Sequence, residues 1–231
     1  SNAPASQQPL QAALPTNLPK DTDTFFWNND GFLDTADGAI MSWSGIADGF
    51  AGQVVQYSKN YESVESENWV NGYYAGANLG SRLVYSGLSG LTAAAQPEVA
   101  DCGLWGADYG SGGLLFSAQP TTHLIKWTGS SGPVATDNDG NVFVGAFLTG
   151  AAHSDAIYAL SKTQSLAHEP QTAATLSESD TGGTASLAAV SVQGSGKGWL
   201  FAKGWDTATA QSVYARQYKS TADAVSVEGD V

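Results

Sequence analysis

The sequence predicts an all-β fold, a β-propeller of about five irregular blades. Short apolar segments alternate with turns rich in Gly, Asn, Asp and Ser, which is typical of antiparallel sheets. The clearest unit, residues 133–163, joins three such segments, and its plan recurs along the chain. A sheet this small cannot bury its own faces, so several units must pack together. A two-sheet β-sandwich of the lectin type is the alternative, although it would not explain a repeated triplet of strands.

Composition supports a β-rich chain and limits its partners. The 231 residues include 27 glycines, while Lys and Glu, which favour surface helices, are scarce. Nine Lys and Arg against 22 Asp and Glu give a net charge of -13, which repels phosphate backbones and anionic membranes. We therefore expect no nucleic-acid partner. No apolar run approaches the ~20 residues that would span a bilayer.

The N-terminal segment differs in composition from the rest of the chain, which predicts the domain organisation. Residues 1–3 are typical of a tag-cleavage remnant, and residues 4–23 are rich in Pro, Gln, Ala and Thr, which predicts a flexible tether. Residues 24–231 fit a single propeller domain. We expect an exported protein, extracellular or periplasmic, anchored through a natural segment upstream of this sequence. The lone Cys102 cannot form an intramolecular disulfide, a usage common in exported bacterial proteins.

Five predicted units follow one another along the domain. Their middle strands lie on average near the ~40 to 45 residues that separate propeller blades. Residues 61–67 carry no clear period and predict an outer connection or a short edge strand. The expected strands are 25–27, 39–43 and 53–57; 69–75 and 81–86; 99–105, 113–118 and 122–128; 134–136, 142–147 and 156–160; and 186–192, 198–204 and 212–218, with a last strand at 224–227.

The segment from Pro133 to Gly145 resembles the blade opening of bacterial exported propeller repeats. In those repeats a strand ends in Asp-x-x-Gly-Asn and resumes as an apolar strand with an aromatic residue, as Asp137 to Phe143 does here. The resemblance implies a propeller fold and an exported protein. It transfers no activity, because such repeats occur in proteins of many functions.

The turn in this segment has two interpretations. Asp137, Asp139 and Asn141 place oxygen atoms at alternate positions, the spacing by which loops bind calcium. The complete calcium-loop pattern, with Gly at its sixth position and a distant Glu, is absent. The same residues suit a tight hairpin, because Asn, Asp and Gly tolerate positive φ. We therefore predict a hairpin turn and keep the metal site as the weaker alternative.

Aromatic residues beside acidic ones are the candidate ligand-binding residues. An exposed ring can stack on a sugar or a peptide while a carboxylate accepts its hydrogen bonds. The alternative is that these aromatic residues cap the ends of blades. We place the binding surface on the loops 44–52, 105–112 and 204–211, which a propeller would gather at one end. The pairs are Trp27 and Asp30, Trp105 and Asp108, and Trp205 and Asp206.

These patterns favour a non-catalytic binding or scaffold module that recognises a protein or a cell-envelope glycan. No cofactor is expected. The alternative is a carbohydrate-active enzyme, because residues 27–31 faintly resemble the entry of five-bladed glycosidases, whose Asp would be Asp30 here. Such an enzyme needs a second carboxylate, for which Asp108 is a candidate, at ~5 Å or at ~6.5 to 9.5 Å.

Overall fold

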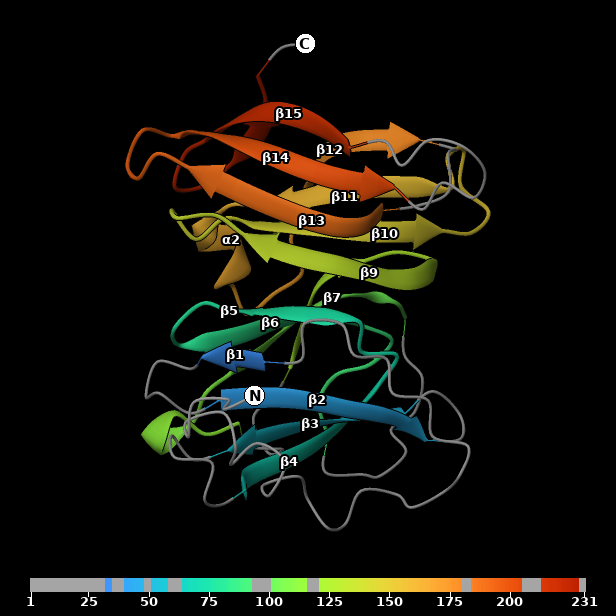
Figure 1. Ribbon diagram of the computed structural model, residues 1–231, viewed down its shortest axis with the longest axis vertical. Coiled ribbons are helices and arrows are strands. Elements are labelled where there is room, and N and C mark those ends of the chain that lie inside the picture. Colours follow the sequence, from blue (N-terminus) through green and yellow to red (C-terminus); the bar gives the residue numbers. More distant parts are fainter. Residues whose placement is uncertain are drawn as a thin grey trace, which may run out of the picture.

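A computed structural model shows an all-β protein, which confirms the all-β part of the prediction (Figure 1). It describes residues 32–34, 40–47, 51–57, 64–92, 101–115, 121–179, 184–204 and 213–228. Within these residues the strands are accompanied by the short helix α2 (Lys162–Ser165) and the 3-10 turn η2 (Ser111–Gly113).

Four sheets of four strands each follow one another in chain order, and every strand pairs antiparallel with its neighbours. Sheet 1 contains β1 (Phe32–Asp34), β2 (Ile40–Ala47), β3 (Ala51–Tyr57) and β4 (Val64–Asn71). Sheet 2 contains β5 (Ala75–Asn78), β6 (Arg82–Gly87), β7 (Gly103–Asp108) and β8 (Thr122–Lys126). Sheet 3 contains β9 (Gly129–Thr136), β10 (Val142–Leu148), β11 (Asp155–Leu160) and β12 (Ala174–Ser179). Sheet 4 contains β13 (Thr184–Ser191), β14 (Lys197–Gly204), β15 (Val213–Ser220) and β16 (Val225–Val227).

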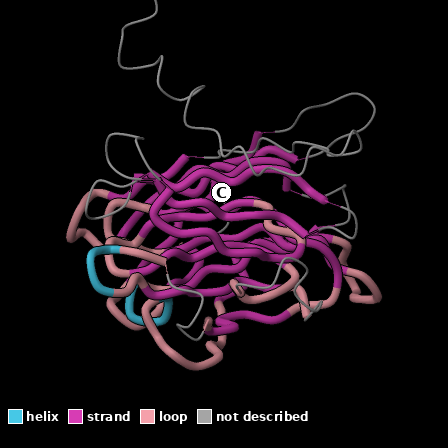
Figure 2. Tube along the Cα trace, turned by 90° about the horizontal axis from the view of Figure 1, so that it is seen from below, coloured by secondary structure: helices cyan, strands magenta, loops and turns pink. Residues whose placement is uncertain are grey.

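The sheets stack face to face in the order 1, 2, 3, 4, with sheets 1 and 4 at opposite ends of the long axis (Figure 1). The first strands of consecutive sheets are neighbours: β1 lies against β5, β5 against β9, and β9 against β13. Viewed along the stacking direction, the strands run across the molecule and α2 lies at one end of them (Figure 2). None of the four sheets closes on itself.

The number of units differs from the prediction. The predicted second and third units form the single sheet 2, so the described residues contain four sheets where about five were expected. The predicted strand 69–75 is two strands, because Gly72, at φ +56°, turns the chain between β4 and β5. Residues 113–118 are not a strand in their described part, where only Leu115 makes an isolated bridge. The two-sheet sandwich alternative is wrong, because four separate sheets are present.

Three apolar cores lie between consecutive sheets. They form because apolar side chains alternate between the two faces of each strand, so that sheets 2 and 3 contribute to a core on either side. The first contains Val54 and Val70 of sheet 1 with Leu83, Tyr85, Trp105 and Ala107 of sheet 2. The second contains Val84, Leu104 and Leu124 of sheet 2 with Val142, Val144, Ala146 and Leu160 of sheet 3. The third contains Phe143, Ile157, Ala159 and Leu176 of sheet 3 with Leu200, Ala202, Tyr218 and Val225 of sheet 4.

Two adjacent residues of β12 test this arrangement. Leu176 is 1% exposed in the third core, while its neighbour Thr175 is exposed. We expect Leu176→Ala to lower the free energy of unfolding by about 2–5 kcal/mol, because it leaves a cavity between two sheets. The matched change Thr175→Ala should alter it by no more than about 0.5 kcal/mol. Urea unfolding followed by tryptophan fluorescence measures both, and equal effects would contradict the stacking of sheets 3 and 4.

Candidate functional site

The predicted site residues fall into two groups. Trp27, Asp30, Trp205 and Asp206 lie outside the described residues, so their predicted roles stay predictions. The others lie in described parts of sheets 2 and 3: Trp105 and Asp108 in β7, and Asp137, Asp139 and Asn141 in the turn between β9 and β10.

Trp105 is not an exposed platform, which corrects the prediction for this residue. Its side chain is 8% exposed in the first core, because β7 is an inner strand paired with both β6 and β8. Its indole nitrogen donates a hydrogen bond to the Gly87 carbonyl at 3.2 Å. Its ring stacks on His123, with the ring centroids 3.9 Å apart. Burial lowers the pKa of His123, which favours a neutral ring in this stack.

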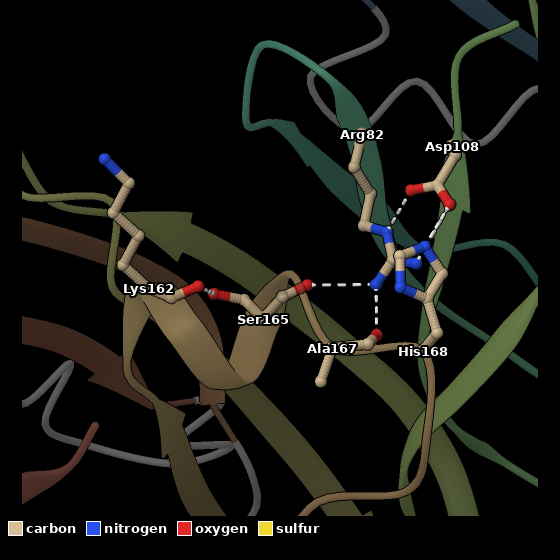
Figure 3. A network of polar contacts seen from close by, with 6 residues as sticks. All are labelled: Arg82, Asp108, Lys162, Ser165, Ala167 and His168. Carbon is tan, nitrogen blue, oxygen red and sulfur yellow. Dashed lines mark hydrogen bonds and ion pairs between the residues drawn. The ribbon is translucent and has the colours of Figure 1, made fainter. Parts of the chain in front are cut away.

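Asp108 ends β7 and pairs with a buried arginine (Figure 3). It lies opposite Arg82 of β6 in the register, and Arg82 is fully buried. The Arg82 Nε and Nη2 atoms donate to the two oxygens of Asp108 at 2.6 and 3.2 Å. His168 Nε2 lies 2.6 Å from Asp108 Oδ2, and the His168 side chain is 69% exposed. Both oxygens of Asp108 are therefore engaged in hydrogen bonds.

The same arginine binds the C-terminal end of α2 (Figure 3). Arg82 Nη1 donates to the carbonyls of Ser165 and Ala167. The Ser165 carbonyl needs a donor because the last carbonyls of a helix have no partner within it, and Ala167 lies just beyond the C-cap residue Leu166. Ser161 caps the start of the helix: its hydroxyl accepts from the Gln164 amide, while the Gln164 side chain accepts from the Ser161 amide. Arg82 thus connects sheet 2 to the segment that joins β11 and β12 of sheet 3.

The ionisation of Asp108 follows from this geometry. Partial burial raises the pKa of Asp108, but hydrogen bonds from Arg82 and His168, together with their charges, outweigh it, so the pKa lies below its ordinary value. Sequence reasoning found Asp108 but missed Arg82 and His168. The available signal was that Arg82 is one of only two arginines and opens a predicted strand.

The turn between β9 and β10 is a hairpin, as predicted. The Gly140 amide donates to the Asp137 carbonyl at 3.2 Å, and Gly140 has a φ of +85°. Asp137 Oδ1 accepts from the amides of Asp139 and Asn141 at 3.0 and 2.9 Å. Its Oδ2 accepts from Asn141 Nδ2 at 2.7 Å and from the Tyr218 hydroxyl at 2.6 Å. With four donors already bound, Asp137 has no oxygen free for a cation, and the described residues contain no group of three possible metal ligands.

This hairpin also joins sheet 3 to sheet 4, which the sequence did not indicate. Asn138 Nδ2 donates to the Ser191 carbonyl at 2.8 Å, and the Gly194 amide donates to Asp139 Oδ1 at 2.9 Å. The hydroxyl of Tyr218, on β15, is buried against Asp137. Burial raises the pKa of Tyr218, and the hydrogen bond to Asp137 raises it further, so the phenol stays protonated as a donor.

A small polar pocket of about 230 Å³ lies beside the hairpin. Asp139 lines it, and its Oδ2 has no hydrogen-bond partner. The pocket is smaller than the ~300 Å³ at which drug-sized ligand sites begin, so it suits only a small polar group. Its walls come from the turn between β5 and β6, from the hairpin and from α2: Asn78, Leu79, Thr136, Asp137, Asn138, Asp139, Gly140, Lys162 and Leu166.

A second surface is apolar and lies on sheet 4. We call it the outer face of sheet 4, because its residues alternate along β13 and β14 with those buried against sheet 3. Val190 pairs with Trp199, and Ala188 with Phe201 in the next row. Val190 is 47% and Phe201 40% exposed. The Trp199 and Phe201 rings stack with their centroids 6.5 Å apart.

The outer face of sheet 4 also contains a shallow apolar pocket of about 150 Å³. Val192, which is 74% exposed, extends the apolar surface beyond the end of β13. Contiguous exposed apolar side chains of this kind mark interaction sites more often than single ones do. The pocket is lined by Val190, Ser191, Val192, Lys197, Gly198, Trp199 and Gln217.

Comparison with protein-family models and with curated proteins found no match to this chain. Among the described residues, no helix has the length and apolar character required to cross a membrane.

The Arg82–Asp108 pair gives a test based on pH. Because the pKa of Asp108 is lowered in the folded protein, its stabilisation is full above the ordinary Asp pKa of about 3.9 and is lost as the pH falls through the lowered value. Asp108→Asn should therefore cost about 3 kcal/mol at pH 7, since it leaves Arg82 buried without its counter-ion. The loss should shrink as the pH falls through the lowered pKa.

His168→Gln is the matched control, because His168 contacts the same carboxylate from an exposed position. It should cost no more than about 1 kcal/mol. Urea unfolding at pH 7 and at pH 3 measures both variants. A cost for Asp108→Asn that is the same at the two pH values would contradict the assignment.

Proposed function

We propose that the protein is a non-catalytic binding or scaffold module of the β-propeller type, acting outside the cytoplasm. The observation that carries the proposal is the outer face of sheet 4. Exposing the apolar side chains of Val190, Val192 and Phe201 to water is unfavourable in free energy. Natural proteins retain such a surface where a binding partner covers it.

Two features support blades of a propeller. Each sheet is a four-stranded meander, and the sheets follow one another in chain order. The first strands of successive sheets are neighbours, as the innermost strands of blades are around a central axis. The resemblance of Pro133 to Gly145 to exported propeller repeats points the same way.

A protein partner suits the outer face of sheet 4 better than a glycan does. A sugar stacks on aromatic rings, but it also needs polar groups beside them. Here Val190, Val192 and Trp199 line the pocket together with Ser191, Lys197 and Gln217, and the surface exposed within it is nevertheless mostly apolar. Aromatic residues surrounded by apolar ones are typical of the centre of protein interfaces.

Location outside the cytoplasm accords with the cysteine usage. Cys102 is 4% exposed, and burial raises the pKa of its thiol to about 11, although hydrogen bonds from Ser131 and its neighbours oppose the rise. A protonated, buried thiol does not react, so it neither requires a reducing compartment nor forms bridges between copies. Attachment to the envelope through an upstream segment is part of the proposal.

The glycoside hydrolase alternative gains no support from Asp108. A general acid needs a raised pKa, whereas the pKa of Asp108 is lowered. Among the described residues, no second carboxylate is paired with Asp108; its partners are Arg82 and His168.

Binding measurements test the proposal. The wild-type protein is presented to a peptide display library and to a glycan array, with the Trp199→Ser/Phe201→Ser variant in parallel. We expect peptide ligands whose affinity falls at least about tenfold in the variant, because truncating central aromatic residues costs more than about 1.4 kcal/mol. Thr175→Ser, on the exposed side of β12, is the control and should bind as the wild type does.

Three results would contradict the proposal. One is the absence of any ligand in either screen. Another is binding that the double substitution leaves unchanged. The third is hydrolysis of chromogenic glycosides by the wild type, with the activity removed by Asp108→Asn, which would favour the enzyme.

A further inference from the structure

The exposed large apolar side chains of the described residues gather on one sheet. They are Val190, Val192 and Phe201, which lie on the outer face of sheet 4 or extend it. The small residues Ala188 and Ala215 lie opposite Phe201 on the two neighbouring strands, and both are exposed. The Phe201 ring therefore has low neighbours on both sides and is accessible to a partner.

Lysine residues stand at both ends of this apolar centre. Alternate residues of a strand share a face, so the outward positions of β14 can be read from its sequence. They are occupied in turn by a lysine, two aromatic residues and a second lysine: Lys197, Trp199, Phe201 and Lys203. Lys219 of β15 lies opposite Lys197 in the register, which places a third lysine on the same face.

The two lysines at one end share a carboxylate with which they form ion pairs. Glu228 Oε1 lies 3.1 Å from Lys197 Nζ and 2.8 Å from Lys219 Nζ. Hydrogen bonds from Lys219 and Lys197 hold the pKa of Glu228 below its ordinary value. An ammonium group has three donors, so each of these lysines keeps donors for a second acceptor.

The charge of this face differs from that of the whole chain. The four strands of sheet 4 contain no Asp or Glu, although the chain has a net charge of -13. Glu228 directly follows β16, and Asp223 lies in the turn before it. Since charges more than ~8 Å apart are largely screened at physiological salt, the nearby lysines decide which charge a partner carries. Acidic groups on the partner form pairs with them, whereas basic groups are repelled.

We propose that the outer face of sheet 4 binds an extended, acidic segment of a partner protein, with two apolar residues flanked by carboxylates. This inference rests on the proposed function, since it names the chemistry of the partner at the same surface. Alternate residues of an extended chain lie about 6.6 Å apart, which is also the spacing of the outward residues of β14. Facing strands align to within about 30°, so a segment lying along β14 presents its groups in the same order.

The apolar pocket gives one side chain of the partner a defined place. Its volume is about 150 Å³, and its lining includes Val190, Val192 and Trp199. A cavity of about 150 Å³ accommodates a benzene ring, so this pocket suits a single Phe or Leu side chain. Lys197 also lines the pocket. A carboxylate two residues from the inserted side chain therefore lies near the Lys197 ammonium group.

Fluorescence anisotropy with the full chain tests the inference. The probe is the labelled peptide Asp-Thr-Phe-Thr-Phe-Thr-Asp with blocked ends, and matched peptides carry Asn or Lys in place of both Asp residues. We expect the Asn peptide to bind about fivefold more weakly and the Lys peptide at least about tenfold more weakly, because each exposed ion pair contributes a small gain. Higher salt should weaken binding of the Asp peptide and leave the Asn peptide unchanged.

A charge exchange shows whether the lysines contact the peptide. Lys203→Glu should weaken binding of the Asp peptide about tenfold, because it places two carboxylates together. Two peptides with Lys in place of one Asp, at either end, cover both directions along β14, and at least one should bind Lys203→Glu more tightly than the wild type. Lys126→Glu is the matched control, because Lys126 is exposed on sheet 2 and pairs with Asp101. Circular dichroism shows that each variant is folded.

Three results would overturn the inference. They are no binding of the Asp peptide, equal affinity of the wild type for the Asp and Asn peptides, and a Lys203→Glu variant that behaves as Lys126→Glu does with every peptide. Library peptides whose affinity depends on Trp199 and Phe201 would still support the proposed function. Failure of this inference is therefore distinct from failure of the proposed function.

Discussion

The packing of sheet against sheet is the constraint on which this structure depends. A four-stranded sheet with apolar side chains on both faces exposes a large apolar area on each side, and burial of that area is the main favourable term in folding. Sheets 2 and 3 bury both faces. No sheet in the stack buries its apolar faces by itself, so stability is a property of the stack.

Polar contacts between the sheets, at the end of the strands where α2 lies, fix how the sheets are placed. Arg82 links sheet 2 to the segment after α2, and the Asp137 hairpin links sheet 3 to Tyr218 of sheet 4. Apolar faces can slide over one another at little cost, whereas a buried ion pair or a carboxylate with four donors is satisfied in one arrangement only. The cores therefore supply the driving force, and these polar groups select the relative position of the sheets.

The sequence predicted sheets 3 and 4 well and sheet 2 poorly, for physical reasons. The residue types from Asp137 to Asn141 specify a tight turn, and the strands on either side of it lie where they were predicted. In sheet 2 the long connections interrupt the predicted pattern of strands, so the prediction divided one sheet into two units. Trp105 was misplaced because an aromatic residue near an aspartate looks the same at a strand end and in a core. Arg82 was missed because its role depends on carbonyls more than 80 residues away in sequence.

The same reasoning explains why the candidate surface was not found in advance. Trp199, Leu200 and Phe201 form a continuous apolar run, which predicts a strand buried on both faces. The strand predicted from this run is confirmed. Whether both of its faces are covered depends on the neighbouring sheets, which the run itself does not indicate. Among the described sheets, sheet 4 has a neighbour on one face alone, so Leu200 is 2% exposed while Phe201 is 40% exposed. A strand with apolar side chains on both faces, only one of which a described sheet covers, is the feature from which the proposed binding surface is inferred.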